Sequence, residues 1–282
     1  MYNVLGNNFQ VRLGEVCSRP SKVIKTPYVA DVMINKDTES INILAHTPSL
    51  GCNGMVDIDA KVYLIEKDAS SKAKCRYTVI ASRIKEKGET YIVGVDPGLG
   101  EKIGQDILLN GIINGFKVKK LDKQFVYEDC RFDFSGITSS NEAFICEVKN
   151  VSIAVYENIR PSQMKKRDYS LRSVSSKIAI FPSGFKPKGL THSERAVKQT
   201  RRLTEIKIKH PEVRCIILYV IQRADIDEFQ LSNGDEIYMN TIKNALSANV
   251  EIAAVSIDWT LTSDGSSLIP FISNSDVKVS LD

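Results

Sequence analysis

The sequence lacks the features that would place the protein in a membrane or outside the cell. No apolar run reaches the roughly 20 residues that a membrane-spanning helix needs. The first segment, 1–14, has neither the basic start nor the apolar stretch of a secretory signal peptide. The six cysteines form no C-x-x-C pair and no zinc-binding spacing. We therefore expect no membrane partner and a reducing compartment, either the cytoplasm or the nucleus.

An extreme composition is also lacking. Charged residues are 26% and hydrophobic residues 43% of the 282-residue chain, which excludes a disordered chain or a membrane protein. The net charge of +4 is compatible with a nucleic-acid partner but does not by itself indicate one. A chain of this length can bury a sizeable core, and we expect two domains.

Short alternating segments dominate the chain before residue 96. They lie at Tyr28–Ile34, Ile41–Ala45, Ala60–Glu66, Lys74–Arg83 and Thr90–Val95. Turn-rich stretches separate these segments, and no convincing amphipathic helix interrupts them. Such a series favours a small β-barrel, which we assign to a first domain at residues 1–95.

From residue 96 the pattern becomes mixed. Lys102–Ile113 has apolar residues close to the 3.6-residue period of a helix, and Thr191-x-x-Glu194 has the capping-box pattern that begins one. Val213–Ile221 is a near-continuous apolar run, typical of a strand buried on both faces. Other strands are expected at Gln124–Phe134, Ala143–Lys149, Lys177–Phe181 and Glu251–Ser256, and another helix at Glu236–Ala248. The order predicts an α/β domain at residues 96–282, a mixed sheet flanked by helices, and an α+β chain overall.

An aspartate and a Glu-x-Lys motif end two neighbouring strand-like segments. Asp133 lies at the end of one, and Glu147 and Lys149 lie at the end of the next. Because side chains alternate along a strand, Glu147 and Lys149 share a face, and a hairpin turning at 136–141 would bring Asp133 near them. Two carboxylates and an ammonium group suit metal-assisted hydrolysis of a phosphodiester. The same three residues also fit the solvated face of an ordinary strand.

The spacing D-x13-E-x-K is the signature of the PD-(D/E)XK nuclease superfamily, and motifs in order from Ala30 to Trp259 resemble the sugar fermentation stimulation protein family. The matching segments are Ala45–Gly51, Val93–Asp96, Asp106–Ile113, Arg131–Phe134, Glu147–Val151, Phe181–Pro182 with Gly189 and His192, and Val220–Asp225. The resemblance implies an OB-like barrel joined to a restriction-endonuclease-like domain. It also implies a nuclease that uses Mg²⁺, or Mn²⁺ in its place.

The resemblance implies roles for the three central residues. Asp133 and Glu147 are expected to bind the metal, because carboxylate oxygens are the ligands that Mg²⁺ prefers. Lys149 is expected to be the charged catalytic group. The alternative for Lys149 is a structural ion pair with either carboxylate.

Further catalytic candidates come from the flanking motifs. Asp106 stands where the family has a third metal-binding glutamate, but its side chain is one carbon shorter. Glu101 is the substitute on the same predicted helix. Gln222 follows the buried strand and either bonds a water or the glutamate, or caps the exit of the strand.

Several basic and polar residues are candidates for nucleic-acid binding. His192 and Lys188 lie at the start of a predicted helix, where free N–H groups favour a phosphate. Lys186 stands in a segment where the family is acidic. His46 in the barrel is either a nucleic-acid contact or a structural hydrogen-bonding group.

Two segments lie outside the resemblance. The stretch 156–176 holds Lys165, Lys166 and Arg167 between tyrosines, which suits either a phosphate-tracking loop or a solvated insertion. The last stretch, 260–282, is rich in Ser, Asp and Asn and is expected to be a surface extension, although its apolar run Leu268–Ile272 should be buried.

Two functions follow from these patterns. The first is a Mg²⁺-dependent nuclease acting on DNA, with RNA as a less favoured substrate. The second is a non-catalytic DNA-binding regulatory protein that keeps the nuclease fold. The complete set of Asp133, Glu147 and Lys149 favours the first, because a binding protein has no need of an acidic pair opposite a polyanion. A homodimer is compatible with either.

Overall fold

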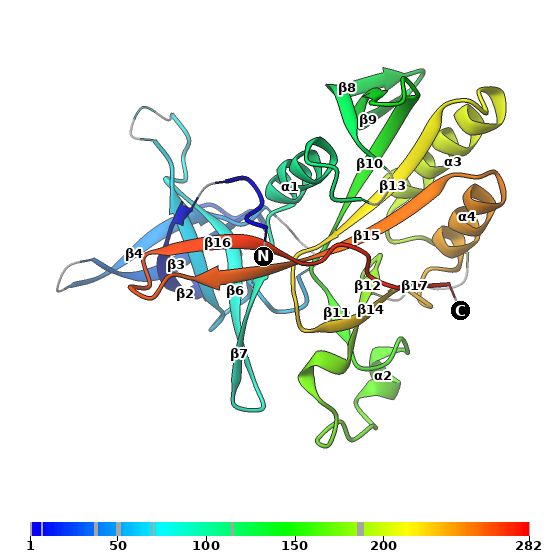
Figure 1. Cartoon of the computed structure of the whole chain (residues 1–282). Helices are drawn as coiled ribbons and strands as arrows, with labels where there is room; N and C mark the ends of the chain where they lie inside the picture. The colour runs from blue at the N-terminus through cyan, green and yellow to red at the C-terminus, as the bar shows by residue number, and fades with distance from the viewer. Residues whose placement is uncertain are drawn as a thin grey trace. The chain divides into compact units, whose positions relative to one another are not determined.

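The computed structural model describes residues 2–6, 8–36, 39–48, 52–68, 70, 72–113, 116–184 and 189–281. The chain forms two compact units, coloured by residue number in Figure 1. Unit 1 comprises Met1–Gly100, Gln222–Ala224 and Ile257–Ser273, and unit 2 comprises Glu101–Ile221, Asp225–Ser256 and Asn274–Asp282. The predicted division into 1–95 and 96–282 lies close to the first of these boundaries but does not contain the two later returns to unit 1. No helix in the described part of the chain is long and apolar enough to cross a membrane.

Unit 1 is built on a closed barrel. Its strands are β2 (Arg12–Ser18), β3 (Val29–Lys36), β4 (Glu39–His46), β5 (Lys61–Glu66), β6 (Tyr77–Glu86) and β7 (Glu89–Gly94). They follow the order β4-β3-β2-β5-β6-β7, and a parallel pairing of β4 with β6 closes the first five into a ring. Gly14 on β2 permits this tight closure, since a Cβ there would lie 2.6 Å from Val32. The predicted small N-terminal β-barrel is thereby confirmed, and β7 extends it as the partner of β6.

The C-terminal stretch contributes to unit 1 as well. The strand β15 (Glu251–Leu261) enters unit 1 at Ile257, and β16 (Ser267–Asn274) follows it through a short turn. Strand β1 (Phe9–Gln10) pairs with β16 in antiparallel register. Leu268 on β16 is fully buried. The expected burial in the run Leu268–Ile272 is thus found at Leu268, and residues 267–274 form a packed strand rather than part of a surface extension.

Unit 2 contains a mixed sheet, as predicted. Its strands are β8 (Val118–Tyr127), β9 (Cys130–Thr138), β10 (Ala143–Val151), β13 (Arg214–Ile221) and the first part of β15, in that order. The β8-β9-β10 strands are antiparallel, whereas β10, β13 and β15 are parallel neighbours. A second sheet has the order β11 (Ala154–Val155), β12 (Lys177–Phe181), β14 (Ile226–Leu231) and β17 (Val279–Ser280). The predicted strand at 177–181 thus belongs to this second sheet.

Helices cover both faces of the mixed sheet. They are α1 (Pro97–Leu109), α3 (Glu194–Lys209) and α4 (Glu236–Ser247); the short α2 (Pro161–Met164) and a 3₁₀ turn (Val174–Ser176) lie in the segment 156–176. Gly104 lets α1 pack closely on β10, since a Cβ there would lie 2.8 Å from Val148. Helix α3 begins after Ser193, whose hydroxyl accepts from the Ala196 N–H, so Ser193 and not Thr191 is its N-cap.

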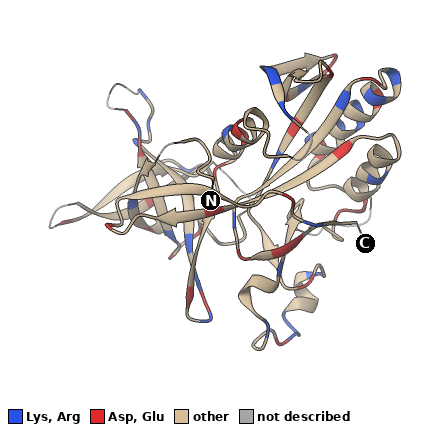
Figure 2. Ribbon diagram, viewed as in Figure 1, with Lys and Arg blue, Asp and Glu red and all other residues tan. Residues whose placement is uncertain are grey.

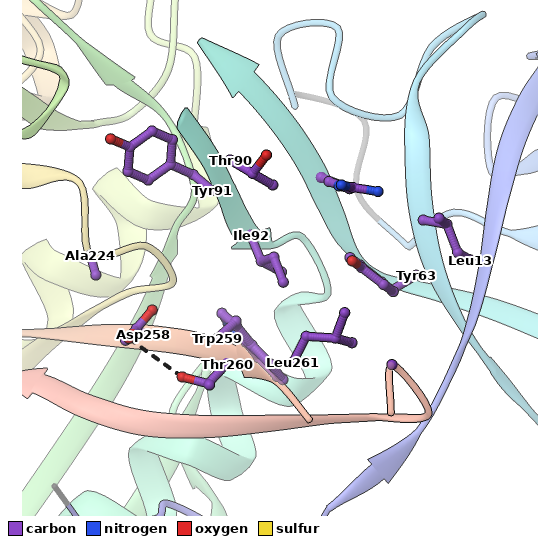
Figure 3. Close-up of a pocket in the computed structure, with 12 residues that line it drawn as sticks. Leu13, Tyr63, Thr90, Tyr91, Ile92, Ala224, Asp258, Trp259, Thr260 and Leu261 are labelled. Atoms are coloured by element: carbon purple, nitrogen blue, oxygen red, sulfur yellow. Dashed lines mark hydrogen bonds between the residues drawn. The ribbon is translucent and has the colours of Figure 1, made fainter. Parts of the chain in front are cut away.

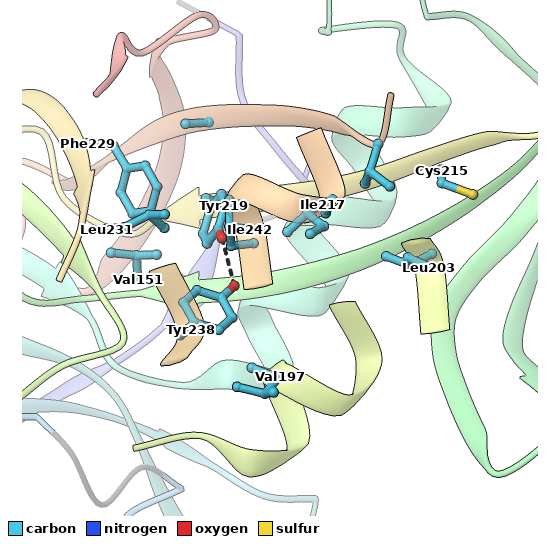
Figure 4. Close-up of a cluster of buried hydrophobic side chains, with 14 of the residues drawn as sticks. Val151, Val197, Leu203, Cys215, Ile217, Tyr219, Phe229, Leu231, Tyr238 and Ile242 are labelled. Atoms are coloured by element: carbon cyan, nitrogen blue, oxygen red, sulfur yellow. Dashed lines mark hydrogen bonds between the residues drawn. The ribbon is translucent and has the colours of Figure 1, made fainter. Parts of the chain in front are cut away.

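The core of unit 2 lies between the mixed sheet and helices α3 and α4 (Figure 4). Leu203 on α3 and Ile242 on α4 are fully buried there, against Ile217 on β13. Tyr219 and Tyr238 are also fully buried and join their hydroxyl groups at 2.7 Å. Each hydroxyl therefore finds a partner inside an apolar core, which avoids the cost of an unmet polar group. The packing fixes α3 against β10, and that contact builds the site below.

Candidate active site

Asp133 lies where β9 and β10 stop pairing. The paired register runs from Ala143↔Ile137 to Cys146↔Phe134. Beyond that pair, Asp133 Oδ2 accepts a hydrogen bond from the Val148 backbone N–H at 2.8 Å. The aspartate side chain thus takes the place of a strand carbonyl, and the hairpin brings Asp133 beside the Glu-x-Lys motif.

Glu147 and Lys149 form a buried ion pair on the α3 face of β10. Lys149 Nζ lies 2.7 Å from Glu147 Oε1, and the two residues are 7% and 3% exposed. Burial of both charges carries a desolvation cost that the pair offsets only with further hydrogen bonds. The alternative expected for Lys149, an ion pair with a carboxylate, is therefore present.

Gln199 completes this arrangement, and the sequence analysis missed it. Its Oε1 accepts from Lys149 Nζ at 2.8 Å, and its Nε2 donates to the Arg131 carbonyl at 3.1 Å. The side chain is 3% exposed on the buried stripe of α3, between Ala196 and Leu203. Gln199 and Thr200 are polar residues within this mainly apolar stripe, and a long amide side chain at such a position is the signal that would have identified Gln199.

One carboxylate oxygen of Glu147 has no hydrogen-bond partner among the described residues. Oε1 accepts from Lys149, whereas Oε2 is buried without a hydrogen-bond partner in the described part of the chain. Such an oxygen costs free energy unless it finds a partner. With Asp133 it offers the hard anionic oxygens that Mg²⁺ and Mn²⁺ prefer, so these residues fit a divalent cation. The described residues contain no ready cluster of three or more His, Cys, Asp or Glu ligands, so such an ion would keep several waters.

The pKa of Asp133 is raised in this buried, acidic environment. Burial raises its pKa, and the negative charges of Glu147 and Glu101 raise it further, to about 7. The Val148 hydrogen bond and the Lys149 charge lower the pKa but do not offset these effects. Burial is thus the main cause of the raised pKa of Asp133, and the two neighbouring carboxylates add to it.

The two candidates for a third carboxylate differ in their surroundings. Glu101 on α1 acts on the pKa of Asp133 and accepts a hydrogen bond from Gln124 Nε2 at 3.0 Å. Asp106 accepts from the side chain of Asn110, one turn further along the same helix. Glu101, the expected substitute, therefore acts electrostatically on Asp133.

Gln222 and His46 are part of unit 1. Gln222 Nε2 donates to the Asp96 carbonyl at 3.0 Å, and the Gln222 carbonyl accepts from the Gly94 N–H. These contacts hold the chain in place directly after β13. They fit the structural alternative for Gln222, that of capping the strand. His46 lies half-buried at the end of β4, where burial and the Lys67 charge lower its pKa.

The corner predicted to bind phosphate already contains a carboxylate. Asp235 Oδ2 accepts from the His192 N–H and from the Thr191 hydroxyl, each at 2.7 Å. Asp235 is also the N-cap of α4. Its negative charge opposes a phosphate at this point. Lys186 and Lys188, the other candidates here, lie outside the described residues.

The segment 156–176 is folded onto itself. Arg167 and Arg172 both lie within ion-pair distance of Glu157, at 3.6 and 3.5 Å, and Tyr156 stacks on Tyr169. Lys165 and Lys166 are exposed and have no ion pair among the described residues. The basic charge available to a ligand is therefore smaller than the composition suggests.

Comparisons with known proteins agree with this architecture. The family model described as "Sugar fermentation stimulation protein RE domain" matches residues 170–263. A sugar fermentation stimulation protein homolog of Jannaschia sp. (strain CCS1) is 26% identical over 238 residues, 83% of this chain and 84% of the relative. A homolog from Carboxydothermus hydrogenoformans is 23% identical and covers 80% of this chain and 83% of its own. The solved structure of Pyrococcus furiosus SfsA in complex with Ca²⁺ has a TM-score of 0.69 at 15% identity, over 99% of this chain and 100% of that one. At that identity the structural likeness speaks for the fold.

Proposed function

We propose that this chain, which belongs to the sugar fermentation stimulation protein family, is a metal-dependent nuclease that hydrolyses phosphodiester bonds, with DNA as its preferred substrate. The observation that carries the proposal is the excess of buried negative charge around Lys149. Asp133 has a pKa of about 7, and Glu147 keeps a buried oxygen without a partner in the described part of the chain. A protein has little reason to bury this excess unless a cation balances it.

Asp133 and Glu147 are the residues that would hold the metal. The ion would lower the pKa of a bound water and offset charge on the phosphate. Val148 supports this role indirectly, because its N–H fixes one oxygen of Asp133 and leaves the other to face the site. Glu101 adds a further negative charge on the side of α1.

Lys149 would act on the substrate directly. Its ammonium group has three N–H donors, and the described residues use two of them, on Glu147 and Gln199. The third is available to a phosphate oxygen or to the attacking water. Because Glu147 and Gln199 hold the group in place beforehand, it can stabilise developing charge with little reorganisation.

The surface of α3 suits an anionic substrate. In Figure 2 the ribbon of this helix, the same one that carries Gln199, is blue at its Lys and Arg positions. Arg195 and Arg201 are exposed and have no ion pair within the described ranges. Each phosphate that such a cation neutralises releases counterions and adds to binding.

A non-catalytic DNA-binding role remains the second candidate. The observation in its favour is the closed ion pair of Lys149 with Glu147, 2.7 Å apart and buried, which is also what a purely structural pair looks like. Under this function, replacing Asp133 or Glu147 by its amide would cause no loss of nucleic-acid binding.

Cleavage assays with matched variants separate the two functions. Labelled single- and double-stranded DNA and RNA are incubated with the protein in Mg²⁺, in Mn²⁺ and in EDTA. We expect cleavage with either metal, none in EDTA, and none with Glu147→Gln. Glu212→Gln, which changes an exposed glutamate of unit 2, is the control and should behave as the parent protein. Binding without metal-dependent cleavage of any of the four substrates would favour the second function.

A further inference from the structure

A cavity lies entirely within unit 1 (Figure 3). Its lining does not include Asp133, Glu147 or Lys149. Its volume is about 510 Å³, within the range of roughly 300–1,000 Å³ typical of small-molecule sites. Strand register explains one wall of it. Leu13 on β2 lies opposite Tyr63 on β5, and Arg83 on β6 lies opposite Ile92 on β7, so these side chains line a single sheet face. The end of β15, Asp258–Leu261, forms the other wall.

Arg83 is the cation of this cavity. Among the described residues it has no ion pair and no hydrogen-bond acceptor, although it is only partly exposed. Burial raises the pKa of the neighbouring Tyr63, and the Arg83 charge opposes that effect. A guanidinium group offers five N–H donors in a planar fork that matches the oxygens of a phosphate. An anion is therefore the missing partner at this end of the cavity.

The rest of the lining suits a flat, partly polar body. Trp259, Tyr63 and Tyr91 supply aromatic surface, and Leu13, Ile92 and Leu261 supply apolar surface. Asp258 is a second charged group in the lining and would repel a second anion. Its carboxylate can accept a hydrogen bond from an amino group, as acidic side chains do with the exocyclic amine of cytosine.

We propose that this cavity binds one nucleotide, with its phosphate at Arg83, its base against the aromatic side chains and an exocyclic amino group at Asp258. The same chemistry is presented by a free nucleoside monophosphate and by one unit of a single strand. The site does not rest on the cleavage proposed above, because none of its residues belongs to the acidic group of unit 2.

Fluorescence provides a direct measurement, because Trp259 is the only tryptophan in the chain. The protein is titrated with dAMP, dCMP, dTMP and inorganic phosphate, and with a short deoxyadenosine strand with and without a 5′-phosphate. We expect a saturable change with dAMP and dCMP, a weaker one with dTMP, which lacks an exocyclic amine, and the weakest with inorganic phosphate. Tighter binding of the strand would identify single strands as the source, and tighter binding of dAMP would identify free nucleotides.

Three variants test the assigned contacts. Arg83→Gln should weaken dAMP binding on the order of tenfold or more, the loss expected for a charge-assisted hydrogen bond. Arg83→Lys should bind dAMP with an affinity between those of the parent protein and Arg83→Gln. Asp258→Asn should reduce the preference for dCMP over dTMP. Arg12→Gln, on the opposite face of β2 from Leu13, is the matched control and should bind as the parent does. Glu147→Gln should also bind normally, even if it abolishes cleavage.

Three results would overturn the site. They are no saturable signal with any nucleotide, equal binding of inorganic phosphate and dAMP, and undiminished binding by Arg83→Gln. Circular dichroism melting of each variant ensures that a lost signal is compared between folded proteins.

Discussion

Unit 2 buries two lysine–carboxylate pairs, and they differ in what surrounds them. Lys149 pairs with Glu147 at 2.7 Å, and Lys177 pairs with Asp225 at 3.2 Å, with every side chain at most 8% exposed. By distance and burial alone the two are alike. A buried ion pair therefore does not distinguish a functional site from a structural one.

Their neighbours make the difference. Lys177 also lies 5.5 Å from the centre of the Tyr156 ring, so an aromatic face adds to the stabilisation of its charge. Around Lys149 the additional groups are the carboxyls of Asp133 and Glu101; burial, together with the charges of Glu147 and Glu101, raises the pKa of Asp133 to about 7. The surroundings of the Lys177–Asp225 pair balance its charges. The Lys149–Glu147 pair, in contrast, is left in need of a cation. We take the unbalanced pair to be the functional one.

Removal of the carboxylate of Asp133, next to the unbalanced pair, should have the largest effect. Asp133→Asn is expected to abolish metal-dependent cleavage, since one carboxylate cannot hold Mg²⁺ against its hydration. Asp225→Asn at the other pair should lower the melting temperature but leave the cleavage rate of the folded protein unchanged. Metal-dependent cleavage by Asp133→Asn at the parent rate would show that the negative excess has no catalytic role.

Substitutions of the two lysines should differ in the same way, one affecting turnover and the other stability. Lys149→Ala is expected to reduce turnover on the order of 10²-fold or more with nucleic-acid affinity nearly unchanged, the scale of losing one electrostatic stabiliser. Lys177→Met should instead lower the free energy of unfolding by about 3–5 kcal/mol, because it leaves a buried carboxylate alone. Denaturant melts and single-turnover cleavage measure the two effects. An affinity loss by Lys149→Ala that parallels its loss of turnover would make Lys149 a phosphate contact only.

Gln199 should matter through Lys149 rather than through the substrate. Gln199→Leu removes one of the two groups that hold the ammonium and is expected to lower kcat about tenfold, equivalent to one hydrogen bond, with little change in KM. Gln199→Glu keeps an acceptor for Lys149 and should recover part of that loss. A rise in KM with unchanged kcat would mean that Gln199 binds nucleic acid instead.

The pKa of Asp133 predicts a pH dependence of stability in the absence of metal. The folded-state pKa, about 7, lies above the unfolded value, so the folded protein binds the proton more tightly. The stabilisation is complete at acid pH, below the unfolded value, and is lost as pH rises through about 7. Between the unfolded and folded pKa values this contribution should fall by about 1.4 kcal/mol per pH unit, which corresponds to one bound proton, and it should be absent in Asp133→Asn. Added Mg²⁺ should restore stability above pH 7 in the parent protein alone.

The smallest effect is expected from the segment beside the balanced pair. Arg167 and Arg172 already pair with Glu157, whereas Lys165 and Lys166 are exposed and have no ion pair among the described residues. Replacing both lysines by Ser should flatten the dependence of nucleic-acid binding on salt by up to about 2 units, with cleavage at saturating substrate retained. An unaltered slope would make 156–176 a solvated insertion and leave α3 as the main cationic surface.

Local periodicity allowed much of this structure to be predicted from the sequence. The alternation of β10 placed Glu147 and Lys149 on one face, and the apolar run Val213–Ile221 predicted the buried strand β13. The short N-terminal strands predicted a barrel. Each of these features depends on residues close together in the chain, so the pattern of side chains carries the information.

Tertiary structure alone decided which distant residues meet. Gln199 reaches Lys149 across 50 positions of sequence, and the charge of Glu101 acts on Asp133, because the rotation of each helix against the sheet is set by packing. The return of 257–273 to unit 1 likewise depends on strand pairing that no local period encodes. The sequence by itself determined which residues share a face of each element. The balance of charge between faces, and with it the difference between the two lysine pairs, required the folded chain, because desolvation and Coulomb energies depend on distances in space.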